Sequence, residues 1–105
     1  MTNNATPFGT TADGKQASLV TLTNAAGLEA RFSDYGATWV SMTTPDSTHQ
    51  LADVLIGFDD VTGYETHPFI SSVVGRYANR ISHGRFALDG IQYQLDRNEE
   101  AHHLH

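Results

Sequence analysis

The sequence predicts an all-β fold, and a β-sandwich is the simplest architecture that fits it. Apolar and polar residues alternate with a period of two in several segments, as they do in strands with one solvated face. A helical period of 3.6 is almost absent. In addition, Asp89-Gly90 lies between two alternating segments, where this dipeptide favours a tight hairpin turn.

The first four predicted strands follow from local composition. Segment 17–23 is rich in β-branched residues and ends at 24–27, which has the composition of a turn. Segment 28–32 alternates apolar with charged residues, as a strand with one solvated face does. The third and fourth strands are expected at 37–43 and 53–56.

A short helix and a hairpin complete the predicted elements. The helical candidate is 59–64, which has an aspartate cap at its start and ends before Pro68. Segments 85–88 and 91–95 flank Asp89-Gly90. Both central residues of a type I′ turn need positive φ, which aspartate tolerates and glycine adopts freely. The sequence therefore predicts an antiparallel hairpin at this point.

Composition excludes several classes of protein. The 105 residues carry 6 Lys+Arg against 12 Asp+Glu, a net charge of -6, and Lys15 is the only lysine. Neither nucleic acid nor an anionic membrane is therefore an expected partner, because both require clustered cations. Cysteine is absent, which rules out disulfides and fits a reducing cytoplasm. The apolar runs are far shorter than the roughly 20 residues that span a bilayer.

Residues 75–81 form the first candidate site. Arg76 and Arg80 share one face of an extended segment, and Asn79 precedes Arg80 directly. A carboxamide beside a planar guanidinium suits a polyhydroxylated ligand. The alternative interpretation is that both arginines pair with surface carboxylates.

The second candidate site is a histidine cluster made of His102, His103 and His105. It has three interpretations: a metal site, a purification tag, or a histidine that hydrogen-bonds a neutral substrate. A catalytic zinc site needs three ligands, usually including distant ones, and no H-E-x-x-H motif is present. We therefore expect no metal. The adjacent Glu99-Glu100 is interpreted as a solvated turn.

Several motifs together resemble one family in their order and spacing. They are residues 7–9, 22–24, 34–38, 51–58, 75–81, 89–90 and 103–105. From Pro7 onward the chain resembles the N-terminal portion of an aldose 1-epimerase (galactose mutarotase). The resemblance implies a large antiparallel β-sandwich that interconverts the α and β anomers of hexoses such as galactose and glucose. It also implies general acid–base ring opening without a cofactor.

The resemblance assigns roles to individual residues. Asn79 and Arg80 correspond to the family's Asn-Arg pair and His105 to its substrate histidine, so all three are expected to bind sugar hydroxyls. Arg76 is expected to be structural, buried beneath the sheet and paired. The family's acid histidine and base glutamate lie in the later half of such proteins. No residue of this chain is therefore assigned to catalysis.

Residues 1–105 are thus expected to be the N-terminal segment of a single epimerase domain, truncated at its C-terminus and inactive alone. Large all-β domains commonly run to about 200–250 residues, which agrees with this expectation. A non-catalytic carbohydrate-binding or regulatory domain is the main alternative, and a histidine-tail metal binder is a third. Oligomeric state stays open, and the expected location is the cytoplasm.

Overall fold

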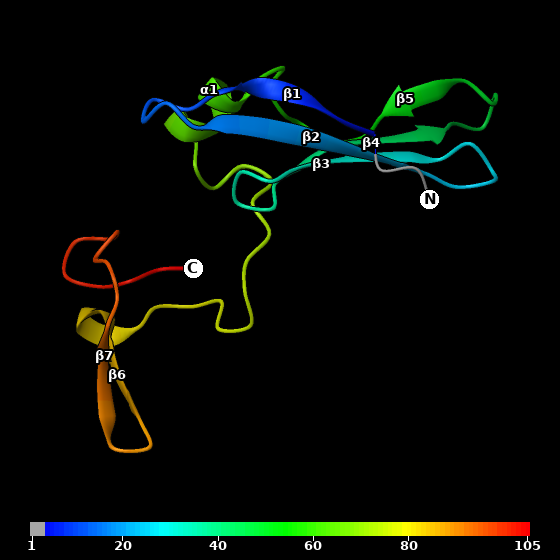
Figure 1. Cartoon of the computed structure of the whole chain (residues 1–105). Coiled ribbons are helices and arrows are strands. Elements are labelled where there is room, and N and C mark those ends of the chain that lie inside the picture. Colours follow the sequence, from blue (N-terminus) through cyan, green and yellow to red (C-terminus); the bar gives the residue numbers. More distant parts are fainter. Residues whose placement is uncertain (1–3) are drawn as a thin grey trace. The chain divides into compact units, whose positions relative to one another are not determined.

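A computed structural model describes residues 4–105, which form two compact units that meet at Val73 and Val74 in the sequence. The first unit contains β1 Asn4–Thr10, β2 Gln16–Thr23, β3 Glu29–Ser33, β4 Trp39–Pro45, β5 Leu51–Asp53 and α1 Val61–Thr66 (Figure 1). The second unit contains the short helix η1 Ser82–Gly84 and the strands β6 Arg85–Leu88 and β7 Ile91–Gln94.

The first unit is built on a five-stranded antiparallel sheet in which each strand pairs with the next one in sequence. β1 was not predicted, because its exposed polar residues and Pro7 give no alternating signal. β4 begins at Trp39, two residues later than predicted. A bulge between β3 and β4 accompanies this shift, since Arg31 pairs with Ser41 but Phe32 pairs with Trp39.

The fourth predicted strand, 53–56, was wrong in position, because β5 covers Leu51–Asp53. The Asp53 side chain explains the shift. Its Oδ1 accepts hydrogen bonds from the backbone N–H groups of Met42 at 2.9 Å and Leu55 at 3.0 Å. A side chain thus takes the place of a strand partner, and the ladder ends at Asp53.

The core of the first unit lies between the sheet and α1. The Asp60 carboxylate caps the helix by accepting from Thr62 N at 3.0 Å, so the predicted aspartate cap is confirmed. α1 buries Val61 and Tyr64, and it lies beside β1 at one end of the sheet (Figure 1). The ring of Tyr64 packs 6.0 Å from that of Phe8. The full core consists of Phe8, Ala17, Leu19, Val40, Val61 and Tyr64.

The opposite face of the sheet is also apolar. The register aligns Val20, Phe32 and Trp39 across three strands, and the Phe32 and Trp39 rings stack at 5.5 Å. Leu22 and Trp39 on this face remain 43% and 37% exposed. In a β-sandwich the inner face of each sheet packs against the other sheet, and this half-exposed apolar face is suited to such packing. The prediction of an all-β antiparallel fold is therefore confirmed.

The second unit contains the predicted hairpin. Leu88 pairs with Ile91 across a two-residue turn, in which φ is 50° at Asp89 and 78° at Gly90. Both central residues have positive φ, as a type I′ turn requires, so this prediction is confirmed. No helix among residues 4–105 is long and apolar enough to cross a membrane.

Candidate functional site

The second unit brings the two candidate segments together. Ile81 and His103 form an antiparallel bridge, in which Ile81 N donates to His103 O at 2.8 Å and His103 N donates to Ile81 O at 3.2 Å. This pairing places the end of the 75–81 motif beside the histidine cluster, although more than 20 residues separate them in sequence. Asn79, Arg80 and His105 are therefore held within one small unit.

Arg80 forms a bidentate ion pair with Glu99. Its Nε and Nη2 each donate to one oxygen of the Glu99 carboxylate. The hydrogen bonds raise the pKa of Arg80 and lower the pKa of Glu99. The alternative interpretation, in which both arginines pair with surface carboxylates, is thus confirmed for Arg80 only. Glu99 therefore binds a residue of the candidate site. Its interpretation as part of a solvated turn did not predict this contact.

Asn79 and His105 are each fixed by one backbone contact. The Oδ1 of Asn79 accepts from Arg80 N at 2.7 Å, so the side-chain carbonyl is used locally and the amide nitrogen is the remaining donor. The Nδ1 of His105 lies 2.7 Å from the carbonyl oxygen of Ala78. Because a carbonyl only accepts, Nδ1 carries the proton in this contact. His105 is therefore anchored next to the Asn-Arg pair.

Arg80 also borders a hollow of about 540 Å³, which is lined by Tyr77, Arg80, Ile81, Ser82, Arg85 and Phe86. Its combination of aromatic rings and a few polar groups is typical of small-molecule sites. Asn79 and His105 are not among the residues that line it. Tyr77 and Phe86 were not predicted as site residues, because an exposed aromatic residue has the same sequence pattern as one that packs on a neighbouring strand.

Arg76 precedes the Arg80–Glu99 pair in the sequence, and His102 follows it. Arg76 was expected to be buried and paired, but it is exposed, so this expectation is wrong for the chain as described. The ring of His102 accepts from His83 N at 3.1 Å through Nδ1. Among residues 4–105, no group of three or more His, Asp or Glu side chains is placed to hold a metal ion.

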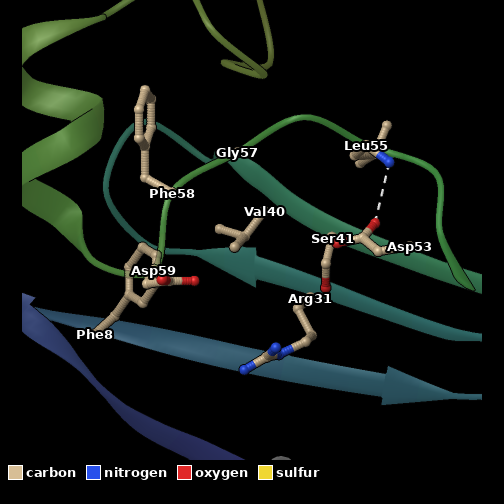
Figure 2. Close-up of a pocket in the computed structure, with 9 residues that line it drawn as sticks. All are labelled: Phe8, Arg31, Val40, Ser41, Asp53, Leu55, Gly57, Phe58 and Asp59. Carbon is tan, nitrogen blue, oxygen red and sulfur yellow. Dashed lines mark hydrogen bonds between the residues drawn. The ribbon is translucent and has the colours of Figure 1, made fainter.

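The first unit contains a second hollow, of about 200 Å³, on the sheet face that also carries the core (Figure 2). Arg31 and Ser41 come from adjacent strands, and the carboxylates of Asp53 and Asp59 lie along the same hollow (Figure 2). Ser41 is buried, and within the described residues its Oγ has no hydrogen-bond partner. None of the predicted site residues lies here.

The comparisons with known proteins agree with the motifs. A family model described as aldose 1-epimerase matches residues 18–105. The chain belongs to the aldose 1-epimerase family. It is 42% identical over 94 residues to the aldose 1-epimerase of Haemophilus influenzae, and 40% identical over 72 residues to the galactose mutarotase of Rattus norvegicus. The resemblance on which the sequence prediction depended is therefore confirmed.

The relatives of this epimerase-family chain are much longer than the chain itself. The matches cover 89% of the chain but 27% of the Haemophilus influenzae protein, and 68% of the chain but 21% of the rat protein. A solved structure of an aldose epimerase homologue from C. elegans superposes with a TM-score of 0.68 at 34% identity. That match covers 85% of this chain and 28% of the other. The shared fold thus extends over most of the chain.

Proposed function

We propose that the complete gene product is an aldose 1-epimerase that interconverts the α and β anomers of hexoses such as galactose and glucose. The match of the family model to residues 18–105 is the observation that carries this proposal. Two relatives, an aldose 1-epimerase and a galactose mutarotase, are named for the same reaction and support the proposal. The reaction needs no cofactor, because proton transfers alone open and close the sugar ring.

In this proposal Asn79, Arg80 and His105 bind hydroxyl groups of the sugar. Asn79 and Arg80 supply amide and guanidinium N–H donors, and His105 supplies an imidazole fixed by the Ala78 carbonyl. Holding the sugar in one orientation lowers the entropic part of the barrier, since ring opening requires an aligned acid and base. The three residues are therefore binding groups and do not transfer protons.

The acid–base pair is proposed to lie in sequence that the 105 residues do not contain. A carboxylate base would take the proton from the anomeric hydroxyl, while a histidine acid protonates the ring oxygen. Rotation of the open aldehyde and closure of the ring would then give the other anomer. We further propose that the chain is the N-terminal segment of a single domain, and that the protein is cytoplasmic and binds neither nucleic acid nor membranes.

Polarimetry of freshly dissolved α-D-galactose tests the proposal directly. We expect the complete gene product to accelerate mutarotation well above the buffer rate. Arg80→Ala should lower kcat/KM by about 10- to 100-fold, the range typical of a lost hydrogen bond to a charged group. Arg97→Ala is the matched control, because Arg97 is an exposed arginine of the same unit.

The two remaining binding residues are tested in the same assay. Asn79→Ala and His105→Ala should each lower kcat/KM, with Arg97→Ala unchanged. If the complete gene product binds galactose without accelerating mutarotation, it is a non-catalytic carbohydrate-binding protein and the proposed activity is wrong.

A further inference from the structure

We propose that Glu99 is a positioning residue for hexose binding. It holds one edge of the Arg80 guanidinium, so that the other edge faces the sugar. This inference rests on the proposed function and extends it to a residue that the motifs leave out. Glu99 lies 19 residues after Arg80 and is not part of the 75–81 motif.

The hydrogen bonds of the ion pair define which donors Arg80 has left. A guanidinium carries five N–H groups in a rigid planar fork. Glu99 accepts from Nε and from Nη2. The two N–H groups of Nη1 and the second one of Nη2 therefore point away from the carboxylate. A ligand that approaches Arg80 meets this outer edge.

The position of the carboxylate is itself determined by backbone pairing. Glu99 N donates to His102 O at 3.1 Å, and His102 N donates to Glu99 O at 2.8 Å. The next residue, His103, is bridged to Ile81, which directly follows Arg80. The carboxylate and the guanidinium thus come from two segments that the backbone already holds side by side.

Arg80 needs such a restraint because its side chain is 55% exposed. An exposed arginine samples many rotamers, and a ligand that immobilises it loses affinity for that reason. The bidentate contact with Glu99 restricts the guanidinium before the ligand arrives. A glutamate carboxylate is ionised at neutral pH, and the contact with Arg80 lowers the pKa of Glu99 further, so the ion pair is present under assay conditions.

The orientation matters because Arg80 borders the hollow lined by Tyr77 and Phe86. A guanidinium released from Glu99 can turn either edge toward that hollow. A guanidinium held by Glu99 presents one defined set of donors to a hydroxyl group. Loss of Glu99 should therefore weaken substrate binding and leave the proton-transfer steps unchanged.

The test uses Glu99→Gln in the complete gene product, with Glu100→Gln as the matched control. The glutamine keeps the size of the side chain and removes its charge. We expect Glu99→Gln to raise KM for galactose about 10-fold with kcat within about twofold, since uniform binding affects KM alone. The Kd for galactose measured by calorimetry should rise with KM, and Glu100→Gln should change neither. Glu99→Asp, which keeps the charge, should recover part of the loss.

A double-mutant cycle separates positioning from a general structural effect. If Glu99 acts through Arg80, Glu99→Gln should cause no further loss in an Arg80→Ala background. Additive losses of kcat/KM in the double mutant, or an unchanged KM in Glu99→Gln, would overturn the inference. The proposed function would still stand if the wild-type protein accelerates mutarotation. A wild-type protein that neither binds galactose nor accelerates mutarotation would overturn both.

Discussion

Removing the hydroxyl group of Tyr64 tests the hydrogen bond that joins α1 to the segment between β5 and α1. The Tyr64 ring is 2% exposed, and it contacts the rings of Phe8 at 6.0 Å and Phe58 at 5.2 Å. Its hydroxyl oxygen accepts from Phe58 N at 3.0 Å. Tyr64→Phe keeps the ring and leaves this N–H without its acceptor. We expect the free energy of unfolding to fall by about 1 kcal/mol. The loss is modest because Phe58 is half-buried, so water can still reach its N–H group in the variant.

Tyr64→Ala gives the scale for comparison. It removes the whole buried ring, and large aromatic-to-alanine changes in cores cost about 3–5 kcal/mol. Urea denaturation of the complete gene product, followed by circular dichroism, measures both losses. Tyr77→Phe is the control, since Tyr77 is 68% exposed and its change should stay within about 0.5 kcal/mol. Equal losses for Tyr64→Phe and Tyr64→Ala, or none for either, would refute the reasoning.

Three further predictions concern other parts of the chain. Gly63→Ala should lower the free energy of unfolding by about 1–3 kcal/mol, because a Cβ at this position overlaps the Phe58 side chain. Helix propensity alone predicts a gain in stability instead, and urea denaturation distinguishes the two signs. The pKa of Asp13 should be about 2 in an NMR titration, because Lys15 lies 2.6 Å away. This pKa lies below its ordinary value of 3.8, so the ion pair stabilises the fold above that pH and is lost as the pH falls through about 2; a midpoint near 4 would contradict it. The 105 residues alone should show no mutarotase activity and should self-associate through the sheet face of Trp39; a sharply melting monomer in ultracentrifugation and calorimetry would argue against this.

The parts of the fold that were predicted correctly depend on local chemistry. The hairpin at Asp89-Gly90 was predicted because its turn requires positive φ at both residues, and the two-residue turn itself sets the strand pairing. The end of β5 was not predictable in this way. It depends on the Asp53 side chain reaching Met42 on the neighbouring strand, and such a contact leaves no trace in the alternation of residues.

In the candidate site, too, the local motif was predictable from the sequence and the long-range contact was not. The Asn79-Arg80 pair is visible as a motif in the sequence, and its role in sugar binding stays a prediction. The Arg80 contact with Glu99 joins positions 19 residues apart, so only the folded chain reveals it. Glu99 on its own resembles any acidic residue in a turn. Arg76 illustrates the reverse error, because a motif residue was expected to be buried and is exposed in the described structure.

The central claim is that Asn79, Arg80 and His105 bind a hexose. A crystal structure of the complete gene product with galactose tests this claim most directly. We predict that hydroxyl groups of the sugar lie within hydrogen-bond distance of all three side chains, with Arg80 still paired to Glu99. Galactose bound at another place, with these side chains turned away from it, would contradict the claim.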